Sequence, residues 1–405
     1  KPGDYTVSLR VTNPANGYAV YQTATLNVKT VFSNGFYFLK ETAGGNTELD
    51  FHTPDGAGGW TTAFDILEAQ LGAPITGAPT SLGMISSYPY INKANGQPET
   101  GAVLVPIGGR DMKVMLLNDM SLVYDHNEIF FSGVAPDHKP IRAYYLSLFD
   151  IPVFISDKGA YSVNSSTGKV GYPVAPAEGC VLSHGMMTGI LYGSSIGQLM
   201  FFDALNGQLV YYTYGGDLMS LSGTPSPTGI THRPLFMGTG GWCVFEDPGT
   251  SDRYLYSLKD ASTTPILEIR SIDAATAPNF NSADIYGSNK TNTQILYGGA
   301  GNRIWMYNTG NSAETALTLQ GMGAGETITM ITHKRGVYNP ADRSDTAGYL
   351  FIATQKGGNY KVYMYKVTGG ETDGEPIIVE GTGKVIDMQY AGGTSVYNSS
   401  YSISY

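Results

Sequence analysis

The stretch RIWMYNTG, residues 303–310, places large side chains at alternate positions and then ends in a polar turn. Close copies of this phrase occur in KVYMYKVTGG, residues 361–370, and in QLMFFDALNG, residues 198–207. Alternation with a period of two residues, closed by Gly or Asn, is typical of β-strands joined in hairpins. Because one chain repeats the phrase, the sequence indicates a repeat architecture.

Aligned on its large residues, the phrase occurs seven times, at intervals of 66, 46, 39, 54, 51 and 58 residues. A short apolar run precedes each copy and an alternating run follows it, so each unit holds about four antiparallel strands. We therefore expect an all-β fold, a seven-bladed β-propeller over residues 31–405. The copies are ELDFH (from Glu48), VMLLN (from Val114), AYSVN (from Ala160), LMFFD (from Leu199), YLYS (from Tyr254), IWMYN (from Ile304) and VYMYK (from Val362).

Two of these units resemble known propeller blades. GAYSVNSSTGKVGYP and QLMFFDALNGQLVYY are similar to the outer-strand turn of quinoprotein-type blades, although the Trp that usually ends that motif is absent. WD and GH dipeptides are missing, which argues against a WD40 array. The resemblance covers blade architecture and gives no support for a quinone, so we expect no cofactor.

Residues 1–30 follow a different pattern. In GDYTVSLRVTNPANGYAVYQTATLNV, Tyr5, Val7, Leu9 and Val11 share one strand face, and a second strand with a register break is expected after the turn. The segment resembles the last two strands of a PKD-type immunoglobulin-like domain. A lone hairpin is marginal in water, so we expect the rest of that domain to be missing.

The hairpin followed by a propeller that opens with GFYFLKETAGGNTELDF resembles the PKD-like surface lipoproteins of Bacteroidetes, which accompany SusC/SusD-type glycan-uptake systems. This resemblance implies an extracytoplasmic place on the outer-membrane surface, through an N-terminal lipid anchor outside this chain. It also implies a polysaccharide or oligosaccharide ligand and outer-membrane uptake proteins as partners.

Composition excludes other classes of protein. The 405 residues carry a net charge of −10, with 52 Gly and 29 Tyr. An acidic chain without a basic stripe is a poor candidate for nucleic-acid binding. The sequence contains no run of 18 apolar residues, so no transmembrane segment is predicted. No signal peptide is recognisable at the start of the chain.

The two cysteines, Cys180 and Cys243, match no metal spacing, and we expect two buried free thiols, with a disulfide as the alternative. None of the six histidines shows a metal-binding spacing, so no metal site is predicted. His52 stands at the polar position of a repeat, where we expect it to cap a turn. The clusters YDHNE and APDHKP, with His126 and His138, are either a loop that reaches a site or a solvated connection, and we favour the latter.

No nucleophile elbow, phosphate loop or calcium loop appears, and paired carboxylates for glycoside hydrolysis cannot be recognised from the sequence. Arg110, His232, Arg233, His333 and Arg335 fit the binding of an anion or a uronate, but they fit surface charge equally well.

Among the aromatic residues, Trp242 and Trp305 are expected to pack within blades. Trp60, Tyr88 and Tyr90 lie outside the repeated columns and are better candidates for an exposed aromatic face. The predicted ligand-binding set is Trp60, Tyr88, Tyr90, Arg110, His126, His138, His232, Arg233, His333 and Arg335.

The functional hypothesis is a cell-surface binding or scaffold propeller that assists glycan capture or uptake. Two alternatives stay open: a propeller-fold polysaccharide hydrolase or lyase, and a protein–protein scaffold of an uptake complex. The sequence does not decide whether the protein is an enzyme.

The first unit lacks an innermost strand, because residues 23–30 belong to the hairpin. Its other strands are expected at residues 36–40, at residues 48–52 and near residues 61–67. GKVIDMQYAGG, residues 383–393, resembles the innermost-strand candidates ETITMITHKRG and TGITHRPLFMG. An unpaired sheet edge beside the pore would be unfavourable. We therefore predict that residues 384–390 pair with residues 36–40 and close the ring.

Overall fold

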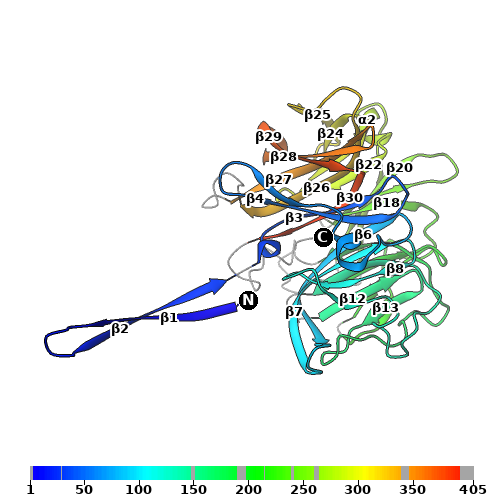
Figure 1. The fold of residues 1–405 in the computed structure, drawn as a ribbon. Helices are drawn as coiled ribbons and strands as arrows, with labels where there is room; N and C mark the ends of the chain where they lie inside the picture. The colour runs from blue at the N-terminus through cyan, green and yellow to red at the C-terminus, as the bar shows by residue number, and fades with distance from the viewer. Residues whose placement is uncertain are drawn as a thin grey trace.

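The computed structural model describes residues 3–28, 30–146, 151–188, 198–213, 215–238, 241–259, 264–338 and 346–392. Within these ranges the strands form one two-stranded hairpin and seven further sheets, which are arranged in a ring (Figure 1). The prediction of an all-β, seven-bladed propeller is confirmed.

The first four blades, each given from the centre of the ring outward, have the following strands. Blade one holds β30 (Lys384–Ala391), β3 (Gly35–Glu41), β4 (Thr47–Pro54) and β5 (Trp60–Ala63); blade two holds β6 (Pro79–Ile91), β7 (Pro98–Gly108), β9 (Val114–Leu116) and β10 (Leu122–Tyr124), with β8 (Asp111–Met112) also on β7; blade three holds β11 (Pro140–Leu146), β12 (Ile151–Ser156) and β13 (Gly159–Ser162); blade four holds β14 (Leu182–Thr188), β15 (Gln198–Asp203), β16 (Gln208–Tyr212) and β17 (Leu218–Ser220).

The remaining three blades have four strands each. Blade five holds β18 (Arg233–Met237), β19 (Trp242–Glu246), β20 (Arg253–Leu258) and β21 (Ile266–Ser271); blade six holds β22 (Ile285–Ser288), β23 (Ile295–Ala300), β24 (Arg303–Asn308) and β25 (Ala313–Ala316); blade seven holds β26 (Thr327–Tyr338), β27 (Thr346–Lys356), β28 (Asn359–Thr368) and β29 (Glu371–Thr382). Short helices η1 (Val31–Ser33), α1 (Ile66–Leu71) and α2 (Pro278–Asn281) lie between strands.

The repeated phrase lies in the third strand from the centre in six blades: β4, β9, β13, β20, β24 and β28. Blade four departs from this alignment, because LMFFD lies in β15, the second strand. The companion run GILYGSS that we expected before it lies outside the described residues. The repeated phrase thus occupies a different strand in blade four. Period-two alternation therefore identifies a strand but does not give its position within the sheet.

Three further expectations need correction. The outer strand of blade one ends at Ala63, and Ile66 and Leu67 begin helix α1 instead. Blade three has three described strands, and its fourth position is an isolated bridge between Ala160 and Val174. The polar position at His52 does not cap a turn, because His52 lies inside β4 and is buried.

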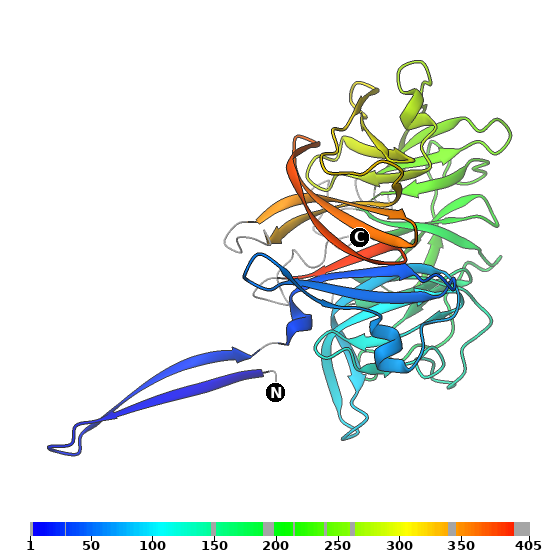
Figure 2. The ribbon, with the colours of Figure 1, turned by 45° about the horizontal axis from the view of Figure 1, so that its top comes forward.

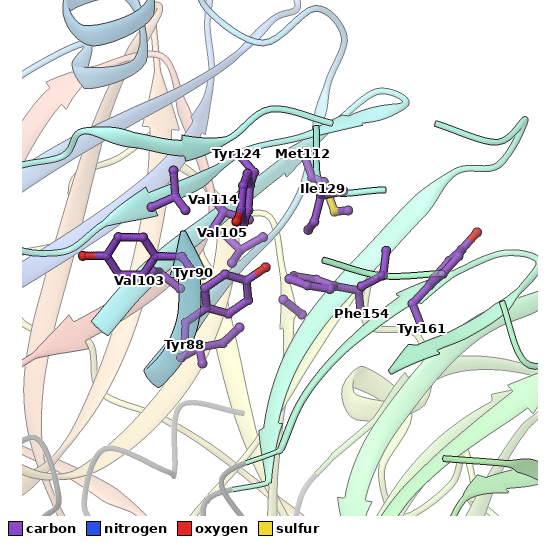
Figure 3. Packing of buried hydrophobic residues seen from close by; sticks show 14 of the residues in the cluster. Tyr88, Tyr90, Val103, Val105, Met112, Val114, Tyr124, Ile129, Phe154 and Tyr161 are labelled. Carbon is purple, nitrogen blue, oxygen red and sulfur yellow. The ribbon is translucent and has the colours of Figure 1, made fainter. Parts of the chain in front are cut away.

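Each blade is buried on both faces, because its neighbours in the ring cover it. One core cluster joins blades two and three, where the ring of Tyr88 meets Phe154 edge-on at 6.1 Å (Figure 3). Strands covered on both sides need large side chains at successive positions, which explains the high aromatic content. Inner strands also approach closely: a Cβ at Gly287 would lie 2.8 Å from Ile331 Cγ2.

The hairpin of β1 (Gly3–Thr12) and β2 (Ala19–Val28) projects away from the ring (Figure 1). Its register runs without a shift from Gly3–Val28 to Thr12–Ala19, so the expected register break is wrong. Val7, Leu9 and Val11 share one face and are 50 %, 61 % and 60 % exposed. The described part of the propeller therefore leaves this apolar face uncovered.

The ring closes as the sequence predicted. Strand β30 pairs antiparallel with β3, with Phe36 opposite Tyr390 and Leu39 opposite Asp387 (Figure 2, where the red strand lies beside the blue one). The rings of Phe36 and Tyr390 stack at 4.9 Å. Blade one is therefore built from the first and the last described strands of the propeller, and no inner strand of that blade is left unpaired within the described residues.

Removal of residues 383–405 should destabilise the whole ring. The deletion uncovers β3 and removes the buried Val385 and Met388, each worth about 1.5–3 kcal/mol of burial. We expect a large drop in the thermal unfolding midpoint measured by circular dichroism. A chain ending at Gly392 keeps β30 and serves as the control. Equal midpoints for the two shortened chains would contradict the closing role of β30.

Candidate functional site

The innermost strands of all seven blades line one cavity of about 210 Å³ at the centre of the ring. Consecutive inner strands contact one another around most of the ring, which brings residues far apart in sequence to one place. Ligand sites in proteins are concave and combine an apolar lining with a few placed polar groups. The central cavity has this character and is the candidate functional site.

One carboxylate organises the wall of the cavity. Asp387 of β30 accepts backbone N–H bonds from Leu82, at 2.9 Å, and Met388, at 2.8 Å. Arg142 of β11 donates to the same carboxylate from 3.2 Å. Burial opposes the charge of Arg142, but Asp387 and Tyr144 outweigh it, so the pKa of Arg142 is raised. The closing strand is thus bonded to blades two and three.

A second cation lies beside this carboxylate. Lys334 of β26 is buried, and its Nζ lies 3.3 Å from Oε1 of Gln389. The Gln389 amide in turn donates to the Leu82 carbonyl at 2.7 Å. Burial lowers the pKa of Lys334 to about 8; the Asp387 carboxylate opposes this change and Arg142 adds to it. Among the described residues, Lys334 is therefore a cation whose charge is only partly balanced.

The lining does not supply the acid pair of a glycosidase. Asp387 is the one carboxylate among the described residues around the cavity. Glycoside hydrolysis ordinarily uses two carboxyl groups on either side of the scissile bond. Nor do the described residues contain a group of three or more His, Cys, Asp or Glu side chains placed to hold a metal ion.

The structure separates most of the predicted ligand-binding aromatics from solvent. Tyr88 and Tyr90 are 0 % and 8 % exposed, and Figure 3 shows both in the core between blades two and three. Trp60 begins β5 and packs edge-on against Phe36 at 5.9 Å. The expectation of an exposed aromatic face is therefore wrong for Tyr88 and Tyr90. Trp305 is buried within its blade, as expected.

The predicted anion-binding residues do not gather at one site. Arg110 pairs with Asp137 on the surface, and Arg233 pairs with Glu246. His232 stacks on Tyr254 with ring centroids 4.1 Å apart.

Two members of that set lie in β26. His333 is buried, and its Nδ1 accepts the backbone N–H of Lys290 at 3.0 Å. Arg335 lies in the same strand, but its side chain is outside the described residues.

The clusters around His126 and His138 do come together. The two Nε2 atoms lie 3.1 Å apart, and His138 Nδ1 is 2.6 Å from the Tyr161 hydroxyl. Burial lowers the pKa of both histidines, that of His138 to about 4, and the pair packs against Phe130. The expectation of a solvated connection is therefore wrong for these side chains, which form a buried polar contact.

A second buried polar network joins blade one to blade seven. The Tyr360 hydroxyl donates to Asp50 at 2.8 Å and lies 3.0 Å from His52 Nε2. Lys40 forms ion pairs with Asp50 at 2.7 Å and with Asp65 at 2.8 Å. Burial, followed by the charge of Lys40, lowers the pKa of His52 to about 4. Polar groups that lie far apart in the chain thus satisfy one another at a blade interface.

Both cysteines are free and buried, as predicted. Burial raises the pKa of Cys180 to about 11, with smaller contributions from neighbouring carboxylates. The pKa of Cys243 is raised further by complete burial. These thiols are poor nucleophiles at neutral pH, because the thiolate is the reactive form.

Sequence reasoning missed Arg142, Lys334 and Asp387. A usable signal existed, because two of the segments that hold them, ETITMITHKRG and GKVIDMQYAGG, had been recognised as innermost strands. A charged side chain in a strand next to the propeller axis reaches solvent most directly through the central cavity. In the first of these segments the prediction chose His333 and Arg335, which flank Lys334 in the sequence.

Comparisons with known proteins support the fold. The chain matches no family model and no curated protein. Its structure is similar to that of a protein from Lactobacillus plantarum, with a TM-score of 0.51 and 12 % identity over 88 % of this chain and 99 % of the other.

Two further structures give lower TM-scores. Dihydro-heme d1 dehydrogenase NirN in complex with DHE gives a TM-score of 0.49 and 9 % identity over 95 % of this chain and 80 % of the other, and the Dos1 propeller gives 0.42 and 14 % over 84 % and 88 %. Identities this low carry no ligand or activity to this chain.

Replacement of Lys40 by Met should destabilise the protein strongly. The change leaves the fully buried Asp50 carboxylate without its cation, which typically costs about 3–5 kcal/mol. Lys93→Met is the matched control, because the Lys93–Glu128 pair is exposed and such pairs contribute about 1 kcal/mol or less. Urea unfolding at pH 7 measures both, and similar losses would contradict the importance of the blade-one network.

The protein should lose stability as the pH falls from about 6.5 to about 4. His52 and His138 have folded-state pKa values of about 4, so protons bind first to the unfolded chain in this window. Each such group changes the free energy of unfolding by up to about 1.4 kcal/mol per pH unit. Urea midpoints between pH 7 and pH 4.5 should fall less steeply for His138→Gln than for the unmodified protein. Parallel slopes would exclude His138 as a contributor.

Proposed function

We propose that this protein is a cell-surface binding propeller that assists the capture or uptake of glycans, with the central cavity as its ligand site. The observation that carries the proposal is the convergence of seven inner strands on one cavity that holds a few placed polar groups. Hydroxyl, amide and charged groups in a concave site can orient a polyhydroxylated ligand through hydrogen bonds. The propeller fold itself is compatible with binding and scaffold roles in general.

The PKD-like resemblance of residues 1–30 supports the location in this proposal. It supports a location on an outer-membrane surface, beside glycan-uptake proteins. In the described residues no helix is long and apolar enough to cross a membrane.

A scaffold function is the second candidate, and the hairpin favours it. Its apolar face, with Val7, Leu9, Val11, Val20 and Leu26, is at least half exposed at each of these residues. Contiguous exposed apolar surface often marks a protein contact. The cavity and the hairpin are separate parts of the molecule, so the two functions can be tested by separate changes.

The protein should bind oligosaccharides without cleaving them at catalytic rates. The lining has one carboxylate among its described residues, where a glycosidase needs two. A glycan array followed by affinity gel electrophoresis measures binding, and chromatography of the incubated glycans measures products. Released oligosaccharide at catalytic rates would replace the binding function by the hydrolase or lyase alternative. Absence of both binding and turnover would favour the scaffold.

A further inference from the structure

The charge inside the central cavity is opposite in sign to that of the whole chain. The chain has a net charge of −10, whereas the described lining places the two cations Arg142 and Lys334 beside the single carboxylate of Asp387. A cleft lined by one sign of charge between low-dielectric walls concentrates its field on a ligand of the opposite sign. The cavity is therefore attractive to anions although the protein as a whole is acidic.

Asp387 cannot balance both neighbouring cations. Its carboxylate already accepts two backbone N–H groups and the Arg142 guanidinium. Among the described residues, Lys334 Nζ donates to the neutral amide oxygen of Gln389 at 3.3 Å. A buried ammonium group that lacks a full counter-charge is unfavourable. A second anion in the cavity would remove this imbalance.

The dimensions and other lining groups limit the anion to a small one. The cavity of about 210 Å³ is below the roughly 300–1,000 Å³ typical of sites for drug-sized ligands. Thr80 and Thr332 place hydroxyl groups in the lining, and Phe236 adds a half-buried aromatic ring. Hydroxyl groups suit the hydroxyls of a sugar ring, and an aromatic face suits its C–H surface.

We infer that the central cavity binds the acidic unit of a glycan, a sugar ring whose carboxylate is held by Lys334 and Arg142. This inference rests on the proposed glycan-binding function and names the class of ligand. It assigns the anion site to Lys334 of β26 and Arg142 of β11, whereas the sequence suggested His333 and Arg335 in β26. Lys334 would supply the charge and Arg142, already fixed by Asp387, the orienting hydrogen bonds.

Ligand binding should be coupled to the charge of Lys334. The charged or titratable groups around it are Asp387 of β30, Arg142 and Tyr144 of β11, Lys290 after β22 and His333 on its own strand. The pKa of Arg142 is raised, so this group stays charged, and burial raises the pKa of Tyr144, so this group stays neutral. A bound carboxylate favours protonated Lys334, so affinity should be full below about pH 8 and should fall above it.

The test is calorimetric titration of the full chain with glucuronate, with glucose as the neutral counterpart and inorganic phosphate as the plain anion. We expect glucuronate to bind more tightly than both, and Lys334→Met to weaken it roughly 10-fold to 100-fold, as for a lost hydrogen bond to a charged group. The same variant should abolish the fall in affinity above pH 8. Lys361→Met, in an exposed pair with Glu380, is the control and should leave binding unchanged.

The thermal stability of the Lys334→Met variant distinguishes a ligand-binding lysine from a structural one. Loss of an incompletely paired buried cation should leave the thermal midpoint of Lys334→Met unchanged or raise it, whereas a structural lysine would lower it. Equal binding of glucose and glucuronate would overturn the acidic-sugar inference and keep the glycan-binding function. Phosphate binding as tight as that of glucuronate would overturn the sugar assignment. Failure of every saccharide, including longer oligosaccharides, would overturn the proposed function itself.

Discussion

The pairing of β30 with β3 is the constraint on which the ring depends. A propeller is stable when every blade is covered by a neighbour, so an open ring would expose two blade faces and one strand edge. Here the pairing joins residues 35–41 to residues 384–391, so that the first blade includes the last described strand. The stacking of Phe36 on Tyr390 adds side-chain packing to the backbone ladder.

The same strand connects closure to the candidate site. The side chains of Asp387 and Gln389 both bond the backbone of Leu82 in blade two, and Gln389 also accepts a bond from Lys334 in blade seven. The carboxylate that bonds Arg142 thus belongs to the strand that completes the ring. Changes in this strand should therefore alter stability and the cavity together, whereas Lys334→Met alters the cavity charge with the strand intact.

The sequence predicted the architecture well because strand alternation is a local property. The blade count follows from this repeated local pattern, whereas the closing pair follows from the unfavourable edge that an incomplete first blade would leave. The position of a strand within its sheet is less local, as LMFFD in blade four shows. The candidate site could not be predicted from local sequence patterns, because Arg142, Lys334 and Asp387 come together only when strands from three blades converge on the axis. The burial of His126 and His138 could not be predicted either. The sequence placed both in solvated loops, yet their side chains pack against each other.

The location of Asp387 in β30 also has a consequence for synthesis. This strand follows every other described strand in the chain, so it leaves the ribosome after them. Until it docks, Arg142 lacks its carboxylate and the wall of the cavity is incomplete. A chain that ends before β30 would therefore lack the complete wall of the proposed ligand site. Ligand binding would then require that β30 has been translated and has paired with β3.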